Sequence, residues 1–204
     1  MNFFLIYPQA VIGSAYFQNG NETFMNSRSK DDLLKLHITT DYGDYTGLFM
    51  SIGMYILSNQ LKSALEEAGF KGVYFKAFDE VIRDNNEDGS HIVSSQKEEY
   101  WLITANKSNF NVIDCSTIPL SDFNFCRGSL IVSEVALNFL YEQKAFVDEK
   151  IINRNDNSFL LTNRFLIEGD IENFILEKMP LIRKQISVLR RAEYRYQEGL
   201  PPLT

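Results

Sequence analysis

The block from Met54 to Phe78 places the strongest constraint on the fold. Ser58 can accept a hydrogen bond from an unpaired amide and so begin a helix. Apolar residues then recur at helical spacing, namely Leu61, Leu65 and Ala68. Gly69 suits the left-handed conformation that ends helices. Residues 71–78 alternate in the manner of a strand that is apolar on both faces. The block therefore predicts a helix followed by a strand.

Several strand-like segments lie one after another in the first 116 residues. They are residues 2–7, 81–83, 91–93, 100–105 and 111–115. Consecutive strands favour an antiparallel sheet over alternating βαβ units. The polar residues 18–30 predict an exposed loop, while the short periodic piece Leu33–His37 fits no single assignment.

The last third of the chain has helical periodicity. Its apolar residues with this spacing are Ile171, Phe174, Ile175, Met179, Ile182, Ile186 and Leu189. Asp170 is a plausible cap, and Pro180 should kink the helix or start a second one. We therefore expect an α+β fold, a mostly antiparallel sheet with packed helices and a helical C-terminal region. Its 204 residues form a single domain, either undivided or as two lobes, strand-rich 1–116 and helix-rich 117–204.

Three segments share a layout in which an apolar triplet precedes a hydroxyl residue and a helical pattern. They begin at Tyr55, Leu130 and Phe159. A strand, a capping residue and a helix often follow one another in α+β proteins. The shared layout therefore indicates either this common motif or an internal repeat. The irregular spacing excludes a solenoid.

The chain is acidic, with a net charge of −7. The segment from Leu181 onward has five basic and two acidic residues, so the preceding body is more acidic than the whole. An acidic body repels nucleic acid and attracts basic partners. Without a membrane-length apolar segment or a basic lead-in, a cytoplasmic protein that binds no membrane is expected. The two cysteines, Cys115 and Cys126, are expected to be buried free thiols.

Residue types that carry catalysis are not gathered in any known pattern. His37 and His91 belong to no metal spacing, and no nucleophile elbow or phosphate-binding glycine loop occurs. A pairing of Cys115 with a distant histidine has no support beyond chance. Residues 84–89 match the start of a calcium loop, but Ser95 stands at its twelfth position, so a hairpin loop is expected. We predict no catalytic site, no metal and no cofactor.

A run of acidic residues is the candidate partner-binding site. It consists of Asp79, Glu80, Asp84, Glu87, Asp88, Glu98 and Glu99. Such a run is either a solvated face or a docking patch for a basic protein. Tyr100 and Trp101 are candidate anchors beside it, or else core residues.

The first 116 residues resemble immunity proteins of bacterial polymorphic toxin systems. The resemblance rests on the opening Asn2–Pro8, the block Tyr55–Phe75, and the segments Tyr100–Ile103 and Val112–Cys115. It implies a protein that binds a cognate toxin and blocks its activity, without chemistry of its own. The toxin would have a basic surface. The alternative is a structural or regulatory protein-interaction module, including one that self-associates, and the oligomeric state stays open.

Overall fold

The computed structural model describes residues 2–8, 13–24, 27–38, 47–51, 53–84, 91–94, 99–104, 121–146, 150–154, 157–161 and 163–197. For residues 84, 91–94, 150–154, 157–161, 185–186 and 188–197 the description covers the backbone alone. The fold is α+β with mostly antiparallel sheets, as the sequence predicts.

The first unit of the fold is a four-stranded antiparallel sheet with one helix. Its elements are β5 (Leu48–Ser51), β6 (Met54–Ser58), α1 (Asn59–Glu67), β7 (Tyr74–Ala77) and β10 (Tyr100–Thr104), and its strand order is β5-β6-β10-β7. The predicted helix and strand are confirmed. The Ser58 hydroxyl accepts a hydrogen bond from the Leu61 amide at 3.2 Å, and Gly69 has a φ of +72°.

The second unit has the same composition of elements but joins distant parts of the chain. Its elements are β1 (Phe3–Ile6), β11 (Phe123–Cys126), β12 (Ser129–Ser133), α2 (Glu134–Glu142) and β15 (Arg164–Leu166), in the order β11-β12-β1-β15. The predicted first strand is confirmed as β1. Because β1 pairs with β12 and β15, the N-terminal strand completes a sheet made from the second half of the chain.

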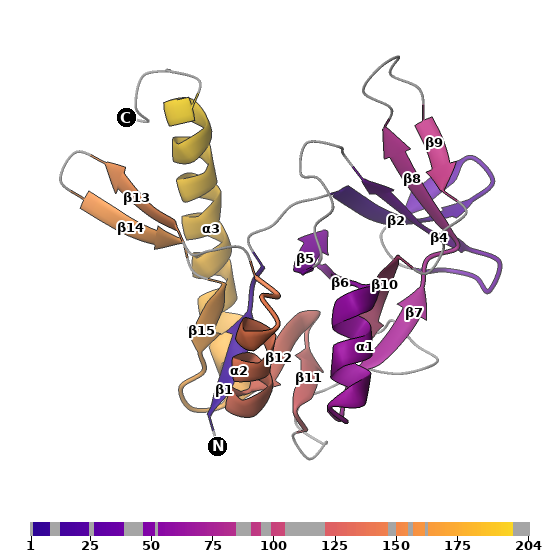
Figure 1. Cartoon of the computed structure of the whole chain (residues 1–204). Coiled ribbons are helices and arrows are strands. Elements are labelled where there is room, and N and C mark those ends of the chain that lie inside the picture. Colours follow the sequence, from indigo (N-terminus) through magenta and orange to yellow (C-terminus); the bar gives the residue numbers. More distant parts are fainter. Residues whose placement is uncertain are drawn as a thin grey trace.

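A third sheet, the outer sheet, lies over the first unit (Figure 1). It contains β2 (Gly13–Asn19), β3 (Glu22–Phe24), β4 (Leu33–Ile38), β8 (Glu80–Asp84) and β9 (His91–Ser94), in the order β3-β2-β4-β8-β9. Only β4 and β8 pair in parallel among its strands. The strands expected at 81–83 and 91–93 are confirmed as the antiparallel pair β8 and β9, while the loop between them lies outside the described residues.

The expected loop at 18–30 is wrong in its first part. Residues 22–24 form β3, which folds back on β2 through a turn in which Gly20 has a φ of +58°. The segment that periodicity left unassigned, Leu33–His37, is part of β4. Polar composition misled here because β3 is exposed except for Phe24, so its side chains resemble those of a loop.

The C-terminal helix α3 (Ile171–Gln197) covers the second unit, beside the hairpin of β13 (Lys150–Arg154) and β14 (Asn157–Leu161). Its residues Ile175, Met179 and Ile182 are buried against the sheet. Of the two outcomes expected at Pro180, the start of a second helix is wrong, because α3 continues through it as one element (Figure 1), and a kink stays a prediction. Because Pro180 has no amide proton, the carbonyl of Leu176, four residues earlier, has no helical hydrogen-bond donor. Both residues are exposed, so water can donate to that carbonyl.

Three apolar cores hold these layers together. The central core lies between the two units and contains both helices, with Leu61 and Leu65 from α1 and Leu137 and Leu140 from α2. A second core lies between the first unit and the outer sheet. A third lies between the second unit and α3. Each unit therefore uses both faces of its sheet, which explains strands with few polar positions.

Two further expectations are corrected. Cys126 is disulfide-bonded rather than a free thiol. The chain has one other cysteine, Cys115, which lies outside the described residues. Of the three segments with a shared layout, the third differs, because Phe159 lies in β14 and Phe165 in β15, with no helix between. The expected strand at 111–115 also lies outside the described residues.

Candidate protein-binding surface

The four acidic candidate residues that the structure describes lie around the outer sheet and β10. Asp79 and Glu80 follow β7, and Glu99 directly precedes β10. Asp84 ends β8, where the backbone alone is described. Glu87, Asp88 and Glu98 lie outside the described residues.

Asp79 has a structural role at the start of the outer sheet. Its carboxylate accepts a hydrogen bond from the Leu34 amide at 2.7 Å. Its own amide donates to the Leu34 carbonyl at 2.8 Å. These two bonds tie the turn before β8 to the beginning of β4.

Glu80 and Glu99 are each paired with a base. Glu80 lies opposite Lys35 in the β4–β8 register, and their charged groups are 2.5 Å apart. Glu99 forms an ion pair with Arg83 of β8. Burial alone would lower the pKa of Arg83, but the hydrogen bond to Glu99 and its charge outweigh this and raise that pKa above its ordinary value.

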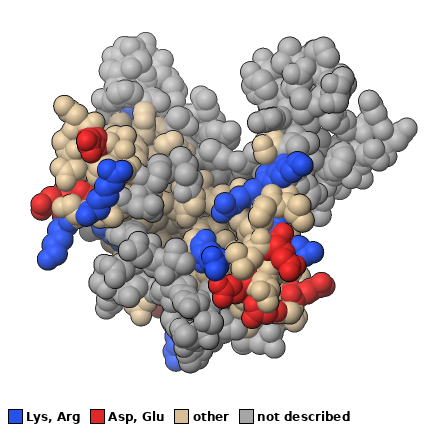
Figure 2. All heavy atoms as spheres, turned by 180° about the vertical axis from the view of Figure 1, so that it is seen from behind, with Lys and Arg blue, Asp and Glu red and all other residues tan. Residues whose placement is uncertain are grey.

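The described acidic residues therefore carry less uncompensated charge than the sequence suggests. Figure 2 shows Lys and Arg side chains interspersed with Asp and Glu over the coloured part of one face. The structure brings Asp79, Glu80 and Glu99 into contacts within the protein. Whether the full set of seven forms a docking patch stays a prediction.

The neighbouring aromatic residues separate into core and surface. Tyr100 and Trp101 are adjacent on β10 and so point to opposite faces of the sheet. Tyr100 is buried and stacks edge-to-face with Phe49 at 5.7 Å between ring centroids. Trp101 is half-buried on the face that carries α1.

Trp101 is the centre of a mixed aromatic and charged cluster, which we call the Trp101 cluster. It consists of Asn59, Lys62, Glu66, Phe75 and Trp101. The indole nitrogen donates to the Asn59 side-chain oxygen at 3.0 Å. The Lys62 ammonium lies 4.4 Å from the Trp101 ring centroid and 5.6 Å from that of Phe75.

Glu66 completes this arrangement with an ion pair to Lys62 at 2.7 Å. The Lys62 side chain is only 15% exposed, whereas that of Glu66 is 52% exposed. A cation over two rings and beside a carboxylate fixes both the lysine and the tryptophan in one orientation. The cluster thus clamps α1 to its sheet and presents an ordered aromatic edge at the surface.

The cluster also touches the acidic run. The Asn59 amide donates to the Glu99 carbonyl at 2.8 Å, so the start of α1 is tied to the residue before β10. Sequence reasoning singled out Trp101 but missed Asn59, Lys62, Glu66 and Phe75 as its neighbours. The i, i+4 spacing of Lys62 and Glu66 was a detectable signal, but the contact with Phe75 depends on the pairing of β7 with β10.

Over the described part of the chain, no group of three or more His, Cys, Asp and Glu residues is arranged to hold a metal ion. None of the helices within that part is both long and apolar enough to cross a membrane.

The sequence was compared with protein-family models and with curated proteins. No protein-family model fits the sequence, and no curated protein is similar to it.

Proposed function

We propose that this protein is a non-catalytic binding protein that neutralises a cognate toxin, in the manner of the bacterial immunity proteins that its sequence resembles. The Trp101 cluster carries the proposal. A half-buried tryptophan, oriented by Asn59 and Lys62, is the kind of anchor that supplies most of the energy of a protein interface. Its position on a helix–sheet scaffold means that little order must be gained on binding.

Charge supports a basic partner. The net charge of −7 speeds encounter with a positively charged protein. Three of the seven acidic candidates are tied into the fold. Partner steering is therefore expected from the other four, which are Asp84, Glu87, Asp88 and Glu98. Steering of this kind acts on the association rate, while the tryptophan acts on the dissociation rate.

The first experiment is co-expression with the toxin domain encoded beside the gene. We expect the protein to abolish toxicity and to form a complex with that domain. Unchanged toxicity, with both proteins folded and present, would contradict the proposed function.

The second experiment locates the interface. Trp101→Ala should weaken the complex by roughly 30-fold, since an anchor residue contributes about 2 kcal/mol. Tyr74→Ala is the matched control, because Tyr74 is 38% exposed on β7 but lies on the opposite side of the strand from Phe75. Equal affinities of the two variants would remove the Trp101 cluster from the interface. Circular dichroism of each variant confirms that the fold is retained.

A third experiment separates steering from anchoring. Replacing Asp84, Glu87, Asp88 and Glu98 by their amides should lower the association rate and its salt dependence, with the dissociation rate unchanged. A change confined to the dissociation rate would instead place these side chains in the contact itself.

A self-associating interaction module is the second candidate. It is favoured by two leucines on α3, Leu176 and Leu181, which are 49% and 61% exposed. Light scattering after size-exclusion chromatography tests it. A stable oligomer that Leu181→Glu converts to monomer would support this candidate, whereas a monomer at all concentrations would remove it.

The disulfide bears on where the protein acts. We propose a cytoplasmic location, but a disulfide at Cys126 is more typical of an oxidising compartment. Rapid thiol alkylation of whole cells, followed by mass spectrometry, measures the state of Cys126. Fully alkylated thiols support the cytoplasm, and a protected disulfide assigns the protein to an oxidising compartment.

A further inference from the structure

The two units repeat one another with a constant offset in the sequence. The bounds of β5, β6 and α1 are Leu48–Ser51, Met54–Ser58 and Asn59–Glu67. Those of β11, β12 and α2 are Phe123–Cys126, Ser129–Ser133 and Glu134–Glu142. Every bound in the second set lies 75 positions after its counterpart, as from Leu48 to Phe123 and from Glu67 to Glu142.

Strand pairing follows the same offset. Leu48 pairs with Leu57 and Ser51 with Met54, and in the second unit Phe123 pairs with Val132 and Cys126 with Ser129. Both hairpins carry a glycine with positive φ, Gly53 at +81° and Gly128 at +75°. An identical strand register places the same side-chain positions on the same faces.

The other two strands of each sheet also correspond. Ser58 lies opposite Tyr100, and Ser133 lies opposite Phe3, so β1 takes the place of β10. On its far side β10 pairs with β7, as β1 pairs with β15. This correspondence holds although β1 opens the chain, whereas β10 follows its own helix and hairpin.

Each helix begins and ends with the same hydrogen bonds. The hydroxyls of Ser58 and Ser133 accept from Leu61 and Ala136, both at 3.2 Å. At the other end the same three hydrogen bonds occur in both units, with donors 68, 69 and 70 in the first unit and 143, 144 and 145 in the second. Gly69 has a φ of +72° and its counterpart Lys144 one of +52°. A lysine rarely adopts this conformation, so the geometry is retained where the residue type no longer favours it.

The two units also bind each other reciprocally. The amide of Leu48, which starts β5, donates to the Ala145 carbonyl after α2 at 2.6 Å. The amide of Phe123, which starts β11, donates to the Lys71 carbonyl after α1 at 3.0 Å. In each unit, the amide at the start of the hairpin's first strand is thus hydrogen-bonded to a carbonyl of the other unit. Both helices contribute side chains to the central core. The donors are equivalent, while the acceptors differ by one position, because the counterpart of Ala145 is Phe70. The arrangement otherwise follows a two-fold symmetric dimer interface, in which each contact occurs twice.

The frequent occurrence of strand–cap–helix motifs in α+β proteins does not account for the correspondence between the two units. A common motif explains why a serine cap follows a strand. It does not explain why the hairpin, the strand register, the cap, the helix length and the hydrogen bonds at the helix C-terminus all recur 75 positions later. Few equivalent positions of the two blocks hold the same residue type. The identical pairs are Gly53 and Gly128, Ile56 and Ile131, Ser58 and Ser133, Leu65 and Leu140, and Glu67 and Glu142.

We infer that residues 48–70 and 123–145 are two copies of one structural block, and that the chain is a fused dimer whose copies pair through a homotypic interface. The partner that the inner face fits is a second copy of the block, supplied by the same chain. The outer faces have diverged, since the first unit is covered by the outer sheet and the second by α3. This inference does not depend on the proposed toxin-binding function.

A graft tests whether the copies are equivalent. Residues 130–142 are replaced by the sequence of 55–67, with Leu137 kept because its counterpart Lys62 is specific to the Trp101 cluster. The control graft uses residues 56–68, which shifts the strand by one position and turns its inner face outward. We expect the first graft to unfold cooperatively with a reduced Tm and the control to be unfolded. Two equally unfolded grafts would overturn the inference.

Amide hydrogen exchange of the intact chain tests the interface independently. Leu65→Ala and Leu140→Ala remove equivalent side chains of the central core. Each should accelerate exchange in both 54–67 and 129–142 by a similar factor. Acceleration confined to the substituted unit would show that the units do not complete each other, and would overturn the homotypic interface. Leu65→Met and Leu140→Met replace any alanine variant that fails to fold.

Discussion

At the scale of single residues, Gly72 lies close to the backbone of the second unit. Its φ is +82°, and a Cβ atom added there would collide with the Phe123 carbonyl and the Ser121 hydroxyl. The Phe123 backbone cannot move away freely, because its amide is bonded to Lys71. Gly69 has a similar φ of +72°, but a Cβ there would meet no atom within 4 Å.

These two glycines make a matched pair for a stability experiment. Gly69→Ala should cost about 1 kcal/mol, because only the left-handed backbone is strained. Gly72→Ala should cost about 3 kcal/mol or more, since the same strain is joined by overpacking. Urea denaturation measures both. Equal losses would show that the unit–unit contact at Phe123 yields without cost.

Asp32 is a second residue with a defined structural role. Its carboxylate accepts hydrogen bonds from the Arg28 amide at 2.5 Å, the Ser29 amide at 2.7 Å and the Asn19 side chain at 2.9 Å. Burial acts to raise the pKa of Asp32, but these hydrogen bonds outweigh it, so that pKa lies below its ordinary value. The charged form therefore holds the turn before β4.

Asp32 should make stability depend on pH in the acid range. A group whose folded pKa is depressed stabilises the fold above its unfolded pKa, about 3.9 for aspartate, and loses this effect as pH falls through the folded value. Melting temperatures between pH 6 and pH 2 should therefore converge for the wild type and Asp32→Asn. The exposed neighbour variant Asp31→Asn should follow the wild type. Parallel curves for wild type and Asp32→Asn would contradict this role.

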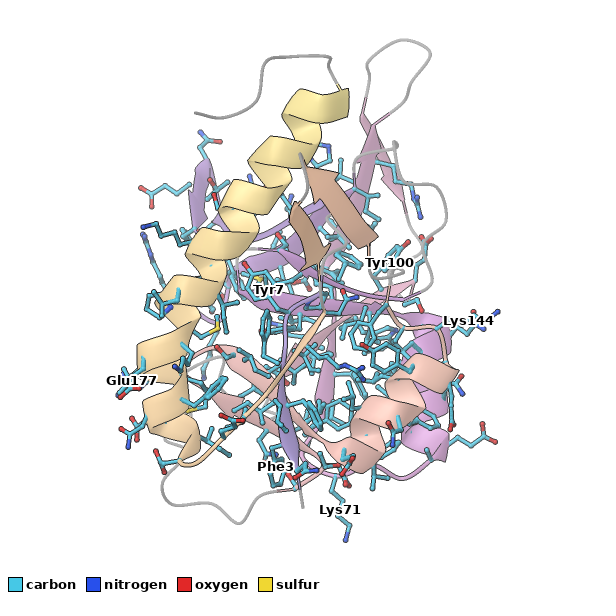
Figure 3. All side chains as sticks on the ribbon, turned by 90° about the vertical axis from the view of Figure 1, so that its left-hand side faces the viewer. Phe3, Tyr7, Lys71, Tyr100, Lys144 and Glu177 are labelled. Carbon is cyan, nitrogen blue, oxygen red and sulfur yellow. The ribbon has the colours of Figure 1, made fainter. Side chains whose placement is uncertain are left out.

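At the scale of elements, α3 shows how one helix serves two environments. Ile175 is 4% exposed and packs over the second unit, whereas the next residue, Leu176, is 49% exposed. Figure 3 shows Glu177 projecting from α3 away from the sheet. The apolar stripe of α3 holds the helix on the second unit. The proline within the helix has no amide proton and so donates no backbone hydrogen bond.

Adjacent alanine substitutions on α3 separate these two environments. Ile175→Ala should cost about 3 kcal/mol, because it leaves a cavity over the sheet. Leu176→Ala should change stability by less than about 0.5 kcal/mol. Chemical denaturation monitored by circular dichroism compares the two. A similar loss for both variants would mean that α3 buries a different face.

At the scale of the whole molecule, stability comes from layers that each bury an apolar face of a neighbouring layer. The two units share the central core, and the outer sheet and α3 close the faces that remain. The disulfide of Cys126 adds a covalent link beneath α3. The only other cysteine in the sequence is Cys115.

Breaking this disulfide should lower global stability. Cys126→Ala should reduce the free energy of unfolding by about 3 kcal/mol, because the unfolded chain regains the freedom that the cross-link removed. Reductant should lower the stability of the wild type to a similar level and have no effect on Cys126→Ala. A wild type indifferent to reductant would mean that the cross-link does not contribute.

Local elements were predictable wherever neighbouring residues alone decide the structure. The Ser58 cap, the end of α1 at Gly69 and the strands β1, β8 and β10 belong to this group. The polar strand β3 was missed, because its pairing with β2 overrides local preference. At Pro180 the sequence left a kinked helix and a second helix open, and packing on a sheet keeps α3 one element. Of the candidate site, the sequence indicated Trp101 but not the residues that orient it.

The amino-acid sequence by itself determined the fold class, the caps and the periodicity of the elements, since these depend on contacts between residues a few positions apart. The tertiary structure alone decided that β1 joins the second unit, that three acidic residues are paired within the fold, and that two blocks 75 positions apart face each other. These features depend on contacts between residues far apart in the chain. Such contacts leave no periodic signal, because many pairings satisfy the same apolar pattern.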